Sequence, residues 1–422
     1  MLESRAPSPP MQIFYFDTLE LPRRLSETAG AFPRGLCFMN DDVRDEPLLL
    51  TPGPCSISMA VKQAMLHDLA FGEAAIVAKV KEARDYLVAL CRGDGDYTAV
   101  PLQGTGTYAV EAAIGTLVPR DGPTAGKLLI HSNGVYGDRI VDVCRQMRVP
   151  YAVLATTPLE RPTVEQFEQA IAADPAISHV AVVHCETSTG MLNPVDEIAA
   201  LCRRLGKGLL IDAIATFGFV ELDARRLGFD AVIVSANKGL QSAPGLSWVI
   251  ARRDALARCK GHSWSHSLDL WDQHDHMERT GQFRFTPPTH LVLAFCEALK
   301  EHNEEGGIAA RGRRYGASWR RLVDGMRQMG FQTLLPDELC ASIVATFHNP
   351  DDPNYSFKKL YDGMKARGFV IFPGRLAAAN TFRIACIGVV TERDIGRAMD
   401  ALADVMREMG VTRFGRGAAG TA

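Results

Sequence analysis

The feature that most restricts the fold of this chain is a regular alternation between residues 127 and 237. Short apolar runs follow one another there, separated by segments with the 3.6-residue periodicity of amphipathic helices. Short buried strands separated by helices are typical of a mostly parallel sheet covered on both faces, so an α/β fold is expected. Strands are expected at 127–133, 151–156, 179–187, 208–213 and 230–237, and helices at 136–147, 163–172 and 193–206.

The sequence outside this alternation predicts three parts. Residues 1–46 mix prolines, charges and aromatic residues without periodicity and are expected to form an N-terminal extension. A helical pattern covers 60–91, and the strand and helix pattern changes near residue 300. We therefore expect a large domain at 47–300 and a smaller C-terminal α+β domain at 301–422 that ends in a disordered GRGAAGTA tail. In the smaller domain, strands are expected at 341–347, 370–374 and 381–388, and helices at 306–330, 357–368 and 391–409.

Charge and cysteine usage exclude several classes of function. The chain has 46 basic and 49 acidic residues, and its net charge of −3 offers no large attraction for nucleic acid or an anionic membrane. Its ten cysteines contain no C-x-x-C pair, which indicates reduced thiols rather than disulfides or a zinc site. No apolar run approaches the roughly 20 residues of a membrane span. We expect a cytoplasmic protein without nucleic-acid or membrane partners.

A glycine-rich turn opens a helix at LQGTGTYAVEAAIG, residues 102–115. Gly104 and Gly106 allow close approach of a ligand, and Thr105 and Thr107 supply hydroxyl groups beside the free N–H groups of the helix start. This combination suits a phosphate, although a capped helix after a tight turn has the same pattern. A dinucleotide site is a further alternative, but Ala109 stands where a third glycine is usual and no strand is expected before the turn.

An acid and a lysine stand at the ends of two expected strands. Asp212 ends the apolar run LLID, and Lys238 follows the run AVIVSAN, where burial is costly for either charge. Because ligands bind beyond the carboxyl ends of parallel strands, both side chains are expected at the same edge of the sheet. A lysine that can bond an aldehyde, an aspartate that keeps a pyridine nitrogen protonated and a phosphate-binding turn match the needs of pyridoxal 5′-phosphate.

Nine segments resemble one family in both order and spacing. They are TPGP (51–54), LQGTGTYAVEA, SNGVYG, HCETSTGMLNP, IDA, SANK, KGHSWSHSLDL, RFTPPTH and FRIACIG. The chain is similar in these segments to the class V, fold-type I aminotransferases, and within them to the 2-aminoethylphosphonate:pyruvate transaminases. The resemblance runs from about Leu48 to Met409. It implies the fold-type I architecture, whose large domain has a mostly parallel seven-stranded sheet, and a homodimer with shared active sites.

The resemblance also implies a role for each matching residue. Lys238 would hold the cofactor and move a proton, and Asp212 would pair with the pyridine nitrogen. Tyr136 would stack on the ring, Thr187 would lie near the ring hydroxyl, and Arg383 would bind the acid group of the substrate. The phosphate would be bound by Thr105, Gly106, Thr107 and Asn237 of one subunit, together with Thr286 of the partner subunit. Pro52 and Gly53 would border the substrate.

The implied reaction is transamination between 2-aminoethylphosphonate and pyruvate, which gives phosphonoacetaldehyde and L-alanine. Ile214 and Ala215 remove a hydroxyl group that the phosphonate enzymes usually carry near the ring. Three alternatives therefore stay open: an alanine or serine aminotransferase that uses glyoxylate or pyruvate, a cysteine desulfurase-like lyase, and a silent binding protein on the same scaffold. A metal site is not expected, because the histidine-rich segment 262–276 has the pattern of a solvated or interface loop.

Overall fold

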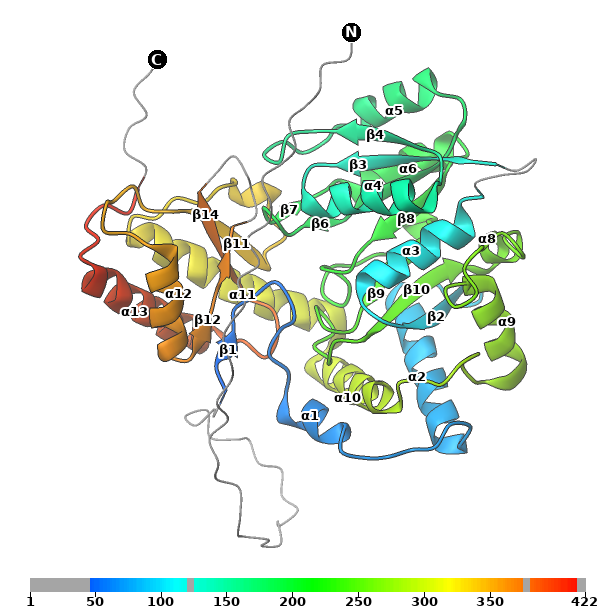
Figure 1. Cartoon of the computed structure of the whole chain (residues 1–422), viewed down its shortest axis with the longest axis horizontal. Helices are drawn as coiled ribbons and strands as arrows, with labels where there is room; N and C mark the ends of the chain where they lie inside the picture. Colours follow the sequence, from blue (N-terminus) through cyan, green and yellow to red (C-terminus); the bar gives the residue numbers. More distant parts are fainter. Residues whose placement is uncertain (1–45, 120–124, 375–379, 416–422) are drawn as a thin grey trace, which may run out of the picture. The chain divides into compact units, whose positions relative to one another are not determined.

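The computed structural model describes residues 46–119, 125–374 and 380–415. Its largest element is a seven-stranded sheet, in which β10 pairs antiparallel with both of its neighbours and all other pairs are parallel (Figure 1). The expectation of a mostly parallel sheet in an α/β fold is confirmed. In spatial order the strands are β2 (Tyr97–Gln103), β10 (Leu246–Arg252), β9 (Ala231–Ser235), β8 (Gly208–Asp212), β5 (Ile177–Val183), β3 (Lys127–Ser132) and β4 (Tyr151–Ala155).

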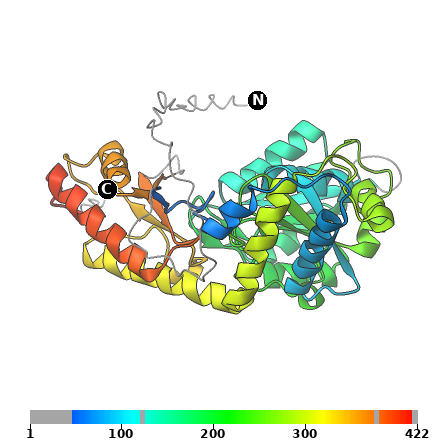
Figure 2. The same ribbon diagram turned by 90° about the horizontal axis from the view of Figure 1, so that it is seen from below.

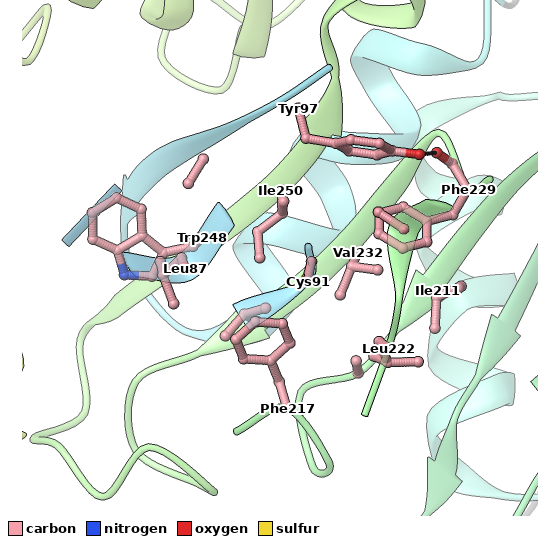
Figure 3. Close-up of a cluster of buried hydrophobic side chains, with 14 of the residues drawn as sticks. Leu87, Cys91, Tyr97, Ile211, Phe217, Leu222, Phe229, Val232, Trp248 and Ile250 are labelled. Atoms are coloured by element: carbon pink, nitrogen blue, oxygen red, sulfur yellow. Dashed lines mark hydrogen bonds between the residues drawn. The ribbon is translucent and has the colours of Figure 1, made fainter. Parts of the chain in front are cut away.

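Helices cover both faces of this sheet, because successive residues of a buried strand point to opposite sides. In β8, Ile211 packs with the helices of one face and Leu210 with those of the other. Figure 3 shows part of the first cluster, where Trp248 and Ile250 of the sheet lie near Leu87. The first face is covered by α2 (Ala74–Leu90), α5 (Val164–Ala173), α6 (Val195–Arg204), α7 (Ala224–Leu227) and α10 (Thr289–Glu305), and the second by α3 (Gly106–Leu117), α4 (Val135–Met147), α8 (Arg253–Ala257) and α9 (Leu270–Thr280).

The C-terminal elements form a separate cluster around a three-stranded antiparallel sheet in the order β11, β14, β13. Helices α11 and α13 pack together beside it, as Figure 2 shows. Leu48 and Leu50 join this cluster, because β1 (Leu48–Leu49) pairs with β12 (Phe369–Val370). The other elements are α11 (Gly307–Gln328), a 3-10 turn at Asp337–Leu339, β11 (Val344–His348), α12 (Phe357–Ala366), β13 (Phe372–Pro373), β14 (Thr381–Ala385) and α13 (Glu392–Met409). The domain limits given above stay predictions.

Three expected elements are wrong in detail. The helix expected at 60–91 is two helices, α1 (Met59–Ala64) and α2, separated by a segment in which Gly72 has a φ of +85°. The strand expected at 179–187 ends at Val183, and β6 (Cys185–Glu186) then pairs with β7 (Met191–Leu192) as a hairpin. The histidine-rich segment is partly helical, because Asp269 caps α9 by accepting a hydrogen bond from the Asp272 N–H.

Two strands of the seven-stranded sheet, β2 and β10, were not expected from the sequence. Strand β2 directly precedes the glycine-rich turn, where no strand was expected, and it carries Pro101, which cannot donate to a sheet ladder. Its position at the edge of the sheet, where it pairs only with β10, makes a proline tolerable. The predictions for the N-terminal extension and the tail fall, apart from Glu46 and Gly415, outside the described residues.

Candidate active site

The carboxyl ends of β8 and β9 border one cavity of about 250 Å³. These parallel strands are neighbours, and their register sets Asp212 opposite Ile233, so Asp212 and the loop that carries Lys238 emerge at the same edge. Seven residues that were given a site role from the sequence line this cavity together: Thr105, Gly106, Thr107, Tyr136, Asp212, Asn237 and Lys238. The other described lining residues are Val110, Arg139, Ile140, Ile214, Ser235, Pro244 and Gly245.

Lys238 is half-buried, and its amine points toward the TPGP turn. Its Nζ donates a hydrogen bond to the Pro52 carbonyl at 2.6 Å. Gly53 makes this approach possible, because a Cβ atom there would lie 2.2 Å from Nζ and the residue has a φ of +131°. Burial lowers the pKa of the Lys238 amine, against the attraction of Tyr136, Cys55 and Asp212. The site therefore favours the neutral amine that covalent and proton-transfer chemistry requires.

Asp212 is a buried carboxylate at the end of β8. Its Oδ1 accepts a hydrogen bond from the Ile214 N–H at 3.0 Å. The pKa of Asp212 is raised from 3.8 to about 6, chiefly by burial and also by the negative charge of Glu186. The hydrogen bond from the Ile214 N–H and the charges of Arg139 and Lys238 act in the opposite direction. A cationic ring nitrogen in the cavity would stabilise the charged form of this acid.

The start of α3 has the features of a phosphate-binding site. Thr105 is the N-cap residue, and its side chain makes no capping hydrogen bond. The first N–H groups of the helix are thus open to an anion. A Cβ atom at Gly106 would lie 2.4 Å from Ile214 Cδ1, so any larger residue here would require the Ile214 side chain to move. Asn237 lies beside this helix start, with its Oδ1 bound to the Ser235 hydroxyl at 2.6 Å.

The residues present fit pyridoxal 5′-phosphate. A lysine amine whose pKa is lowered by burial, a buried acid and an uncapped helix start line the same cavity. These are the three groups that the aldehyde, the ring nitrogen and the phosphate of this cofactor require.

Glu186, on β6, was not expected from the sequence and is fully buried against the start of α4. Its carboxylate accepts hydrogen bonds from the N–H groups of Tyr136 (3.0 Å), Gly137 (3.3 Å) and Ser188 (3.1 Å). It thereby holds the backbone of Tyr136 and stabilises the positive end of the helix. The only sequence signal was an acid at the end of an apolar run in HCETSTG.

A second missed feature is a polar network behind the lysine loop. Gln241 has a φ of +57° although it is not glycine, and its side-chain amide donates to Tyr315 Oη (2.5 Å) and to the Gly388 carbonyl (2.6 Å). The fully buried Arg311 donates to the carbonyl of Gly239, next to Lys238, at 2.7 Å. These contacts join the lysine loop to α11 and to the segment after β14.

Arg383 lies on β14 and is fully buried. Its Nη1 donates to the Thr187 carbonyl at 2.8 Å, and its Nε donates to the Pro373 carbonyl at 3.1 Å. The structure thus brings together Arg383 and Thr187, although neither lines the described cavity. Thr286 is exposed on the segment between α9 and α10 and contributes nothing to the cavity of its own chain.

Two other kinds of site are absent from the described part of the chain. Residues 46–119, 125–374 and 380–415 contain no group of three or more His, Cys, Asp or Glu side chains that could hold a metal ion. Over the same ranges, no helix combines the length and the apolar character that crossing a membrane requires.

Comparison with known proteins defines the family. Residues 60–359 match the Aminotransferase class-V family. The 2-aminoethylphosphonate–pyruvate transaminase of Pseudomonas putida (strain GB-1) is 46% identical over 365 residues, which cover 86% of this chain and 98% of the relative. The protein of the same name from Cupriavidus necator is 44% identical over 367 residues, covering 87% and 96%.

A solved structure shares the fold at lower identity. Pyridoxamine–pyruvate aminotransferase from Mesorhizobium loti superposes with a TM-score of 0.79 at 23% identity, covering 87% of this chain and 94% of that one. The chain therefore belongs to the class-V aminotransferase family and has its fold-type I architecture. It is an aminotransferase, and its cofactor is pyridoxal 5′-phosphate.

Proposed function

We propose that this aminotransferase transfers the amino group of 2-aminoethylphosphonate to pyruvate, giving phosphonoacetaldehyde and L-alanine. The observation that carries the proposal is the cavity in which Lys238, Asp212 and the start of α3 meet. The choice of donor and acceptor rests on relatives that are 44–46% identical over most of the chain and carry this name. Bound pyridoxal 5′-phosphate supplies an electron sink for the carbon that loses its proton.

The residues around the cavity have distinct tasks in this proposal. Lys238 holds the cofactor covalently and, as a neutral amine, moves a proton to and from the reacting carbon. Asp212 keeps the ring nitrogen protonated, and Tyr136 packs on the ring. Thr187 lies near the ring hydroxyl. The phosphate is bound by Thr105, Gly106, Thr107 and Asn237.

Substrate contacts come from the C-terminal side of the site. The Arg383 guanidinium is a planar fork of donors, which suits a carboxylate and a phosphonate alike. Pro52 and Gly53 border the substrate beside the Lys238 amine. A cysteine desulfurase-like activity is disfavoured, because no cysteine is among the described residues that line the cavity.

A panel of amino donors tests the donor assignment. With pyruvate as acceptor, 2-aminoethylphosphonate should yield alanine and should bleach the visible absorbance of the bound cofactor faster than serine does. Alanine with glyoxylate should be a poor pair. A protein that responds to serine or alanine but not to the phosphonate is one of the alternative aminotransferases.

The proposal includes a cytoplasmic homodimer in which Thr286 of the partner subunit completes the phosphate site. The exposure of Thr286, and its absence from the cavity of its own chain, support this arrangement. Subunit mixing tests it, because Lys238→Ala and Thr286→Asp should each impair the homodimer, whereas a mixed dimer keeps one native site. Activity that does not recover on mixing contradicts a shared site.

A further inference from the structure

Two cationic side chains are among the described residues that line the cavity, Lys238 and Arg139. The pKa of Lys238 is lowered by burial, and its amine is bound to the Pro52 carbonyl. Among the described lining residues, Arg139 carries the permanent positive charge, because a guanidinium stays protonated in proteins. It lies on α4, one helical turn after Tyr136, and is half-buried.

Arg139 differs in its partners from three other shielded arginines. Arg84 pairs with Glu278 at 2.6 Å, Arg252 with Asp230 at 2.7 Å and Arg311 with Glu305 at 2.6 Å. For Arg139, by contrast, the described parts of the chain provide no carboxylate within 4.0 Å.

The contacts that Arg139 does make orient it toward the cofactor site. Its Nη1 donates to Thr107 Oγ1 at 3.3 Å, and its Cζ lies 4.9 Å from the centroid of the Tyr136 ring. The guanidinium is thus held by a hydroxyl group and an aromatic ring, and neither cancels its charge.

The position of Arg139 identifies the anion that it suits. Thr107 belongs to the first turn of α3, next to Thr105 and Gly106, so the guanidinium lies at the helix start that would receive a phosphate. A phosphate ester carries about −1.5 to −2 charges at neutral pH. The other donors there are neutral, and the helix end supplies only about half a positive charge.

We propose that Arg139 is a direct ligand of the cofactor phosphate, which it binds from the α4 side of the cavity. This goes beyond the proposed function, which gives Arg139 no role, and it rests on the same cofactor site but not on the identity of the amino donor.

The test compares cofactors with and without a phosphate. Dissociation constants of pyridoxal 5′-phosphate and of unphosphorylated pyridoxal are measured on cofactor-free wild type, Arg139→Gln and Arg139→Lys. We expect Arg139→Gln to weaken binding of the phosphorylated form by about 10- to 100-fold, the effect of losing a charge-assisted hydrogen bond, and to leave pyridoxal binding within about twofold. Arg139→Lys should recover part of the loss, because it restores a point charge without the fork of donors.

Arg145→Gln is the matched control. Arg145 lies on the same helix, is exposed and pairs with Asp142 at 2.6 Å, so its loss should change neither dissociation constant. Inorganic phosphate provides a second readout, since it should strengthen pyridoxal binding in wild type but not in Arg139→Gln.

Three results overturn the proposal. An equal loss of affinity for both cofactors assigns Arg139 a structural role through Tyr136. Unchanged cofactor affinity with a raised KM for the amino donor or for pyruvate assigns it to the substrate. No change in any constant leaves it without a binding role. None of these measurements depends on which donor the enzyme uses, so failure here is distinct from failure of the proposed function.

Discussion

The two sides of the active site are built differently. On the sheet side, Asp212 and the Thr105–Thr107 turn stand at strand ends and helix starts, and they face a cavity. On the C-terminal side, Arg383 is fully buried on β14 and bound to carbonyl oxygens of Thr187 and Pro373. The sheet side thus presents its polar groups to a cavity, whereas the C-terminal side holds its arginine inside the protein. In the proposed function, the sheet side binds the cofactor and Arg383 binds the acid group of the substrate.

Lys238 connects the two sides. It follows β9 of the large sheet, yet its amine is bound to the Pro52 carbonyl, in the segment that leads out of β1. Changes to the lysine, to either side or to the contact between them should therefore have effects of different kind and size.

The largest effect is expected at Lys238. Lys238→Arg keeps a positive charge but removes the amine that can become neutral, so the transamination rate should fall by at least about 10³-fold. Steady-state rates, together with borohydride trapping of the cofactor and peptide mass analysis, measure this. Trapping in wild type at another lysine would contradict the assignment. Lys365→Arg, at an exposed position in the last turn of α12, is a control that should be neutral.

Arg383 should give the next largest effect, and on a different parameter. Arg383→Lys loses the planar fork, and Arg383→Ala also loses the charge, so kcat/KM should fall by about 100- to 1000-fold for the alanine variant and by less for the lysine variant. Raised KM values for the acidic substrates, with cofactor affinity close to wild type, would sharpen the contrast between the two sides.

Arg407→Ala controls for the loss of an arginine from the C-terminal elements, because Arg407 is exposed and pairs only one helical turn away with Asp404. If Arg383→Ala instead released the cofactor while leaving KM unchanged, the division into a cofactor side and a substrate side would be wrong.

Because Asp212 is a buried acid, the free energy of unfolding of the cofactor-free protein should depend on pH. Because the folded-state pKa is raised from 3.8 to about 6, the folded protein binds this proton more tightly than the unfolded chain does. That stabilisation is complete below about pH 4 and is lost as the pH rises through about 6. Asparagine does not titrate. The free energy of unfolding of cofactor-free Asp212→Asn should therefore rise relative to wild type, by up to about 3 kcal/mol, as the pH increases from about 4 through about 6.

Urea unfolding of both cofactor-free proteins across this pH range measures the difference. The exposed Asp404 supplies a comparison, since Asp404→Asn should show a difference from wild type that stays within about 0.5 kcal/mol. A flat difference for Asp212→Asn would mean that the acid is already charged and stabilised in the empty site.

The smallest effect is expected at the contact between the two sides. Gly53→Ala would set a methyl group 2.2 Å from the Lys238 amine, and its backbone would be strained by about 1–3 kcal/mol. Gly95→Ala is the matched control, because Gly95 also has a positive φ (+87°) but has no atom within 4 Å of an added Cβ. Both variants should lose stability, but only Gly53→Ala should also lower cofactor affinity, by about tenfold. If Gly53→Ala and Gly95→Ala changed stability and cofactor affinity equally, backbone strain alone would explain the effect of Gly53→Ala.

Much of the sheet side could be predicted from the sequence. Asp212 and Lys238 end apolar runs, and parallel strands bring their carboxyl ends to one edge, so local pattern and topology together predicted their meeting. The helix starts at Thr163 and Thr391 were likewise predicted from the sequence. Each is a capping box in the structure, and such a cap involves only residues three positions apart.

Glu186, Arg139 and Gln241 could not be predicted in the same way. Glu186 meets Tyr136 across 50 positions of the chain, and Gln241 meets Gly388 across 147. In sequence, each is one polar residue among many. Strand β2 was missed for a related reason, because the edge position that makes Pro101 tolerable is a property of the assembled sheet.

The order of residues along the chain thus decided the strand and helix pattern, the fold class and the side chains that stand at strand ends, since each depends on neighbours a few positions away. Tertiary packing alone decided that the Lys238 amine reaches Pro52, that Glu186 holds α4 and that Arg139 lies over Tyr136 beside Thr107. The pKa shifts also belong to packing, because the desolvation of an amine or a carboxylate depends on how many atoms from distant segments surround it.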